Sequence, residues 1–371
     1  MSQACAAGSR ADNDPMTGPG KRVALVLGSG GARGYAHIGV LQVLAERGYE
    51  VVAIAGTSMG ALVGGLAAAG KLEPYTEWVR GLTQRDVLRL LDPALSSPGA
   101  FRAERVLARM SEILGGALIE DLPIPFTAVA TDLGTRREVW FTSGPVDVAI
   151  RASIAIPSLI TPIMVNGRLL VDGGLLNPVP VEPVIGVNAD FTLAVSLSGW
   201  TPWGAAAATK ESSVQRPPRE WLDRFMRTAG GVLENDLVLS VLARLGTGRT
   251  LESASPTAPP PYDPPPPNLG IVDVTSMALD TMTALVTRYR MAAQPPDVLV
   301  TVPAAAARTV DFHRAVELIE LGRTLTAEAL DGAFGPAGAG PTPTPTPTPA
   351  AGEVELVEAA TAVDNSAPST D

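Results

Sequence analysis

The stretch V-A-L-V-L-G-S-G-G-A-R-G at residues 23–34 decides the fold of this chain. Its first five residues form a continuous apolar run, which is typical of a parallel strand that is buried on both faces. The glycines end this strand, and residues 35–47 then carry apolar side chains at helical spacing up to Gly48, a predicted glycine cap. The stretch therefore predicts a strand, a glycine-rich turn and a helix.

The same order of elements repeats directly downstream. Residues 50–55 predict a second buried strand, and the small residues at 59–69 predict a second helix. Two strand–helix units within about fifty residues are typical of a parallel α/β layer. Asn166-Gly167 predicts a hairpin turn. Further strands are predicted at 126–131, 137–141, 169–171 and 191–197, and further helices at 102–114, 146–154, 219–245, 271–290 and 311–330.

Composition divides the 371 residues into one large domain and its flanks. With 46% hydrophobic residues the chain can bury a sizeable core. We expect a disordered N-terminal segment at 1–20, a domain at 21–331, and a disordered acidic tail with Pro-Thr alternation at 332–371. An insertion rich in tryptophan and proline is expected at about 199–268. Two interpretations of its Trp residues and apolar helix stay open, transient contact with a membrane surface and ordinary core packing.

Charge and cysteine content exclude several classes of protein. The chain has 28 lysines and arginines against 38 acidic residues, a net charge of −10, which disfavours nucleic acid as a partner. Cys5 is the only cysteine, so an intrachain disulfide is excluded. Residues 1–20 lack the apolar run of a signal peptide. The sequence contains no uncharged apolar run long enough to predict a transmembrane helix. These features predict a cytoplasmic protein that is at most peripheral to the membrane.

The motif G-T-S-M-G at 56–60 places a serine between a buried strand and a helix. This G-x-S-x-G context is the one that a nucleophile elbow requires, because the two glycines permit a tight turn from which Ser58 projects. The helix N-terminus favours developing negative charge beside the serine. The alternative is an ordinary strand-to-helix turn with a capping serine.

The glycine loop at 28–34 does not match the common phosphate-binding patterns. Counting from Gly28, the sixth position of G-x-G-x-x-G is Arg33, and no Gly-Lys-Ser/Thr follows. What remains is a loop with exposed N–H groups and one cation, which suits an oxyanion formed during acyl transfer. The alternative is a plain tight connection between strand and helix.

Asp172-Gly173-Gly174 closes a predicted strand and offers a carboxylate as a base. Aspartate before glycine is by itself most often turn chemistry. The chain has only two histidines, His37 and His313, so a carboxylate is the better candidate for the base of a serine hydrolase. The three glycine-framed motifs in this order predict such an enzyme.

The two histidines leave one rival open. Ser58, Asp172 and His313 follow the chain order of an α/β-hydrolase triad. Against this triad, only two strands precede Ser58, and His313 lies in an amphipathic helical pattern. His37 is expected to hydrogen-bond the glycine loop. Two histidines and one remote cysteine do not make a zinc site, and no metal or organic cofactor is expected.

These residues resemble the patatin-like phospholipase family, and within it the bacterial proteins related to neuropathy target esterase. The resemblance runs from about Val23 to Leu330. Beyond the three motifs it includes Y-A-H-I-G-V-L at 35–41, R-A-S-I-A-I-P at 151–157, N-P-V-P at 177–180 and D-F-H at 311–313. Ser29 stands where the family often has another glycine.

The resemblance implies a three-layer α/β/α fold with a mainly parallel central sheet, and hydrolysis of acyl esters of lipids by a Ser–Asp dyad. It implies that Ser58 is the nucleophile, that Asp172 is the general base, and that Gly30 and Gly31, with Arg33 nearby, form the oxyanion hole. The supporting glycines of the motifs are Gly28, Gly34, Gly56, Gly60, Gly173 and Gly174. Phospholipids or lysophospholipids are the expected substrates. A lipid acyltransferase on the same dyad and a non-catalytic lipid-binding scaffold stay open.

Overall fold

The computed structural model describes residues 20–90, 99–101, 103–199 and 271–335. The predicted helix at 219–245 lies outside these residues, and so do almost all of the predicted insertion and disordered ends. The last described helix, α11, runs from Ala315 to Phe334 and so passes the predicted domain boundary at 331. In the part of the chain that is described, no helix combines the length and hydropathy needed to cross a membrane.

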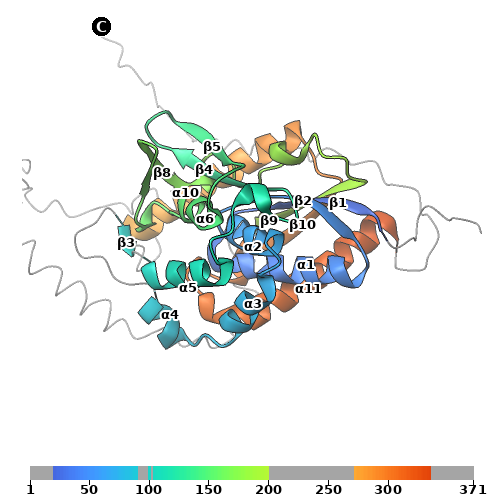
Figure 1. The fold of residues 1–371 in the computed structure, drawn as a ribbon, viewed down its shortest axis with the longest axis horizontal. Coiled ribbons are helices and arrows are strands. Elements are labelled where there is room, and N and C mark those ends of the chain that lie inside the picture. The colour runs from blue at the N-terminus through green and yellow to red at the C-terminus, as the bar shows by residue number, and fades with distance from the viewer. Residues whose placement is uncertain (1–19, 91–98, 102, 200–270, 336–371) are drawn as a thin grey trace, which may run out of the picture.

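A single eight-stranded sheet forms the centre of the molecule (Figure 1). Its strand order is β10-β9-β1-β2-β4-β8-β7, and β5 pairs with β4. The sheet strands are β1 Arg22–Leu27, β2 Glu50–Thr57, β4 Phe126–Asp132, β5 Arg137–Phe141, β7 Ile163–Val165, β8 Arg168–Asp172, β9 Phe191–Gly199 and β10 Val298–Pro303. The short strands β3 Gly99–Phe101 and β6 Ser158–Ile160 pair with each other.

Helices flank this sheet. The α-helices are α1 Ala36–Glu46, α2 Met59–Ala68, α3 Leu72–Arg80, α4 Gln84–Leu90, α5 Glu104–Leu114, α6 Val146–Ser153, α10 Ile271–Ala293 and α11. Short 3-10 helices are η1 Gly31–Tyr35, η2 Ile119–Asp121, η3 Gly173–Leu175, η4 Glu182–Val184, η5 Ala304–Ala306 and η6 Phe312–Arg314. In Figure 1, α1, α2, α3 and α11 gather on one side of the sheet.

The parallel half of the sheet forms as the apolar runs predict. Strand β1 lies between β2 and β9 and is parallel to both, and its residues 23–27 are fully buried. One face packs Leu25 and Leu27 into the main core with α1, α2 and α11. The other face packs Val26 against Val179 and Val184 in the segment that includes η4. The predicted α/β class, with a mainly parallel central sheet between flanking layers, is confirmed.

The antiparallel part of the sheet brings two distant strand ends together. Strand β5 pairs with residues 128–132 along one edge of β4, so β2 and β8 share the opposite edge. Because β2 is parallel and β8 antiparallel to β4, their carboxyl ends point toward each other. Thr57 lies opposite Val129, and Asp172 lies opposite Ala130. The residues that follow β2 and end β8 therefore meet over adjacent positions of β4.

Candidate active site

Ser58 occupies a strained turn between β2 and α2. Its φ of 59° and ψ of −124° lie where residues other than glycine are rare, which is the backbone form expected of a nucleophile elbow. Its N–H donates to Ser153 Oγ at 2.8 Å, and Ser153 Oγ donates in turn to Val129 O at 2.6 Å. The side chain is only 2% exposed. The turn is therefore tight, buried and held by α6 and β4, which a strained backbone conformation needs in order to persist.

The glycines around Ser58 allow two backbones to touch. A Cβ built on Gly60 falls 1.9 Å from Leu27 O, so the first turn of α2 rests directly on the end of β1. A Cβ built on Gly34 falls 2.3 Å from Met59 Cβ, so the glycine loop rests on the residue after Ser58. Any side chain at these two positions separates the glycine loop from the serine turn.

The carboxylate of Asp172 contacts Ser58 directly. Ser58 Oγ donates to Asp172 Oδ2 at 2.5 Å, and the N–H of Gly174 donates to Asp172 Oδ1 at 2.7 Å. The backbone N–H of Asp172 donates to Ala155 O at 2.9 Å. A Cβ on Gly173 falls 2.2 Å from Val129 O, so this turn also lies close against β4. Both carboxylate oxygens are thus fixed by hydrogen bonds.

Burial changes the acidity of this carboxylate. Asp172 is 5% exposed, and desolvation raises its pKa from 3.8 to about 6, although the hydrogen bonds from Ser58 and Gly174 act in the opposite direction. At neutral pH the group is ionised and still a stronger base than an exposed aspartate. A pKa close to the working pH favours general base catalysis.

The glycine loop keeps two N–H groups free. The N–H groups of Gly28, Ser29 and Ala32 donate to backbone carbonyls of neighbouring segments. Those of Gly30 and Gly31, between them, have no acceptor in the described part of the chain. Gly31 has φ of +56°, a conformation that glycine adopts without strain, and it lines the same cavity as Ser58. The loop can therefore present two adjacent donors to an anion.

Arg33 and His37 hold this loop from outside. Arg33 Nη1 donates to the carbonyl oxygens of Ala304 and Ala307 at 3.0 and 3.1 Å, so its guanidinium ties the loop to the segment around η5. His37 Nε2 donates to Gly28 O at 2.9 Å, and complete burial lowers the His37 pKa to about 4, which keeps the ring neutral. The predicted tether between His37 and the glycine loop is confirmed.

An apolar cavity of about 70 Å³ lies beside Ser58. Helices α3, α4 and α5 and the segment after α6 form its walls. The two phenols in its lining, Tyr35 and Tyr75, hydrogen-bond each other, and burial raises both pKa values, so they stay neutral. The lining residues are Gly31, Tyr35, Ser58, Met59, Leu62, Tyr75, Trp78, Leu82, Val87, Leu90, Ala103, Val106, Ile154, Ile156, Ile160 and Phe312. The apolar lining suits a hydrocarbon group, and the volume has room for only a short part of an acyl chain.

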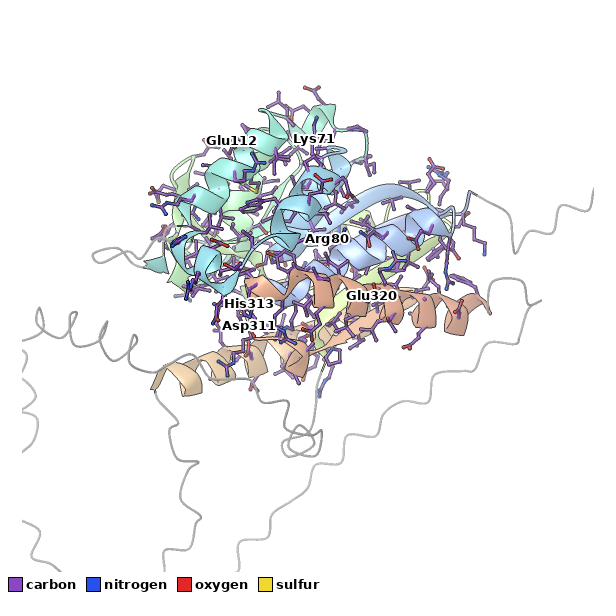
Figure 2. All side chains as sticks on the ribbon, turned by 90° about the horizontal axis from the view of Figure 1, so that it is seen from below. Lys71, Arg80, Glu112, Asp311, His313 and Glu320 are labelled. Carbon is purple, nitrogen blue, oxygen red and sulfur yellow. The ribbon has the colours of Figure 1, made fainter. Side chains whose placement is uncertain are left out.

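His313 lies in η6, on the segment that leads into α11, where Figure 2 labels it with Asp311. Among the described residues, no hydrogen bond joins His313 to Ser58 or Asp172. Its neighbour Phe312, rather than the imidazole, lines the cavity.

Two further residues of the site were not assigned a role from the sequence. Ser153 lies in R-A-S-I-A-I-P at 151–157 and Asn177 in N-P-V-P at 177–180, but their hydrogen bonds to the Ser58 and Asp172 turns depend on the packing of α6 and β8. In the described residues, no three His, Cys, Asp or Glu side chains gather into a metal-ligand group.

A comparison with known proteins finds a matching family model and several similar proteins. The family model described as "Patatin-like phospholipase" matches residues 25–185, the segment that holds the glycine loop, the serine turn and Asp172. An "uncharacterized NTE family protein" of Mycobacterium tuberculosis (strain H37Rv) is 46% identical over 334 residues, which cover 84% of this chain and 91% of that protein. Mouse "Patatin-like phospholipase domain-containing protein 7" is 33% identical over 185 residues, which cover 48% of this chain but 14% of that protein.

Among solved structures, VipD from Legionella pneumophila matches 82% of this chain and 67% of its own, with a TM-score of 0.39 and 12% identity. The family model and the mycobacterial relative confirm the resemblance that the sequence motifs indicate. The chain belongs to the patatin-like phospholipase family, in the branch of the NTE family proteins.

Proposed function

We propose that this protein hydrolyses acyl esters of phospholipids or lysophospholipids with Ser58 as nucleophile and Asp172 as general base. The observation that carries the proposal is the buried 2.5 Å hydrogen bond from Ser58 Oγ to Asp172 Oδ2 beside an apolar cavity. Membership of a phospholipase family supports a lipid as substrate.

The reaction follows from this pair in two halves. Ser58 Oγ attacks the acyl carbonyl carbon while Asp172 Oδ2 takes the hydroxyl proton, and a tetrahedral oxyanion forms. The C–O bond to the alcohol then breaks, and Asp172 returns the proton to the leaving oxygen. Water attacks the acyl-Ser58 ester in the same way, with its proton passing to Asp172. The fatty acid leaves, and Ser58 regains its proton.

The free N–H groups of Gly30 and Gly31 are the oxyanion donors in this proposal. They are the two groups of the loop without an acceptor in the described residues, and Gly31 lines the cavity next to Ser58. Fixed donors in a water-poor site stabilise a developing oxyanion strongly, and loss of one typically lowers the rate by about 10²–10³. The contacts of Arg33 with two carbonyl oxygens support a role in holding the loop.

The cavity provides a place for the acyl chain. Its lining is almost entirely apolar, and its two phenols are neutral and satisfied by each other. Each buried methylene of a substrate contributes about 0.8 kcal/mol of binding free energy. We therefore infer that part of the acyl chain enters this cavity and that the polar headgroup stays outside it.

The direct contact between Ser58 and Asp172 favours the dyad over a triad. In a Ser-His-Asp triad the imidazole lies between the serine hydroxyl and the carboxylate. Here the two oxygens are 2.5 Å apart, which leaves no space for a ring between them. His313 makes no hydrogen bond to either residue in the described part of the chain.

The test is hydrolysis of lysophosphatidylcholine and a short-chain nitrophenyl ester by wild type, Ser58→Ala, Asp172→Asn and His313→Ala. We expect the first two variants to lose activity by about 10²-fold or more and His313→Ala to match wild type. A folded but inactive His313→Ala would favour the triad. Transfer of the acyl group to added glycerol in preference to water would identify an acyltransferase. An inactive wild type would favour a non-catalytic lipid-binding scaffold.

A further inference from the structure

Asn177 connects the two turns that carry Ser58 and Asp172. Its carbonyl oxygen accepts a hydrogen bond from Thr57 Oγ1 at 2.9 Å, and its N–H donates to Gly173 O at 2.8 Å. Thr57 directly precedes Ser58, and Gly173 directly follows Asp172. Asn177 is fully buried. A displacement of Asn177 therefore moves the nucleophile and the base relative to each other.

The side chain of Asn177 is held by two carboxylates. Asn177 Nδ2 donates to Glu138 Oε2 at 3.0 Å and to Glu182 Oε2 at 2.9 Å. Glu138 comes from β5 and Glu182 from η4, so this amide links two separate elements. Two carboxylates that converge on one amide repel each other unless a cation lies between them.

Arg290 of α10 supplies that cation. Its Nη1 donates to Glu182 Oε1 at 2.5 Å, and its Nη2 pairs with Glu138 Oε1. The three side chains are 30% (Arg290), 17% (Glu138) and 23% (Glu182) exposed, so water screens their interaction only in part. The rigid guanidinium fork bridges both carboxylates at once, which the single ammonium of a lysine does less well.

We propose that Arg290 is a positioning residue for the Ser58–Asp172 pair. By pairing with Glu138 and Glu182 together, it keeps both carboxylates on Asn177, and Asn177 then fixes the two catalytic turns. The inference rests on the proposed function, because its effect is on the rate of the serine reaction. No part of Arg290 contacts Ser58 or Asp172 through a hydrogen bond in the described residues.

The test compares the full-length chain with Arg290→Met, Arg290→Lys and the double variant Arg290→Met/Glu182→Gln. We expect Arg290→Met to lower kcat about 10- to 100-fold with little change in KM, because the acyl cavity is untouched while the reacting groups shift. Arg290→Lys should fall between wild type and Arg290→Met. The double variant should regain most of the kcat, because it removes the repulsion that Arg290 balances.

Matched controls separate this role from general stability. Arg288→Met removes an exposed arginine of the same helix and should leave kcat unchanged. All assays are run at temperatures where circular dichroism shows each variant folded, so a purely structural role leaves kcat near wild type. Full kcat in Arg290→Met, or no recovery in the double variant, overturns the positioning role.

Ser58→Ala in the same series separates this inference from the proposed function. Equal hydrolysis by wild type and Ser58→Ala overturns both. Loss of hydrolysis in Ser58→Ala together with full kcat in Arg290→Met overturns the positioning role alone. If Arg290→Met does not fold, the comparison of Arg290→Lys with wild type gives the same kcat-against-KM separation.

Discussion

Replacing Asp172 with asparagine should make the protein more stable while it removes activity. Burial raises the Asp172 pKa from 3.8 to about 6, so between these pH values the folded chain holds the proton more tightly than the unfolded chain. The free energy of unfolding therefore falls as pH rises from about 4 to about 6 and then levels off. At about 1.4 kcal/mol for each tenfold change in proton affinity, the ionised carboxylate destabilises the fold by about 3 kcal/mol above pH 6.

Asparagine keeps the hydrogen bonds and lacks the charge. Its amide oxygen can accept from the Gly174 N–H as Asp172 does, and its amide nitrogen can donate to Ser58 Oγ, which keeps that contact with the direction of the hydrogen bond reversed. We expect Asp172→Asn to exceed wild type in free energy of unfolding by about 3 kcal/mol at pH 7–8 and by much less near pH 4. Other titrating groups are common to both proteins, so the difference isolates Asp172.

The assay is urea unfolding of both proteins in steps from pH 4 to pH 8, followed by circular dichroism. Ser58→Ala serves as the control for loss of the 2.5 Å hydrogen bond without removal of the carboxylate. A stability difference that does not change with pH would refute the reasoning. So would a wild type that is the more stable protein at pH 8.

Three further outcomes are expected. The kcat/KM of wild type should fall about tenfold per pH unit below about pH 6, because protonated Asp172 cannot accept the serine proton; a flat profile to pH 5 contradicts this. Gly60→Ala should lower the free energy of unfolding by about 3 kcal/mol, because the added Cβ falls 1.9 Å from a carbonyl oxygen of β1. Gly186→Ala, which has open space around it, should leave the free energy of unfolding unchanged, and calorimetry compares the two variants. Val106→Phe, in the cavity wall, should reduce hydrolysis of long-chain esters more than hydrolysis of acetyl esters. Val316→Phe, at an exposed position, should change neither rate. An equal loss on both esters contradicts a role of the cavity in binding the acyl chain.

The local elements of the site were predictable because their signals are local. The glycines around Ser58 and the apolar runs of β1 and β2 gave the strand–turn–helix units within a residue or two of their observed bounds. The Asn166-Gly167 turn between β7 and β8 is also observed, with positive φ at both residues. Each of these depends on backbone geometry that neighbouring residues dictate.

The features that the sequence did not predict depend on contacts between residues that are far apart in the chain. The meeting of Ser58 and Asp172 follows from β2 and β8 sharing an edge of β4, which no local pattern reveals. Helices α3 and α4, which wall the cavity, and the edge strand β10 were not predicted. The sequence of β10, V-L-V-T-V-P, is interrupted at Thr301 and ends in proline, so it lacks the five-residue apolar run of β1.

The contacts of charged side chains were the least predictable feature of the site. Arg33 was expected beside the oxyanion, and its observed hydrogen bonds go to Ala304 and Ala307, residues far away in sequence. Its share in the oxyanion hole stays a prediction. The contacts of Arg290 with Glu138 and Glu182 join three distant segments, and nothing in their spacing indicates a common site.

The most direct test of the central claim is reaction with a fluorophosphonate, followed by peptide mass spectrometry. We expect a single adduct on Ser58 in wild type, formed at the same rate in His313→Ala and about 10²-fold or more slowly in Asp172→Asn. Labelling of Ser58 that is as fast in Asp172→Asn as in wild type would contradict Asp172 as the base. An adduct on any other residue, with Ser58 unmodified, would contradict Ser58 as the nucleophile.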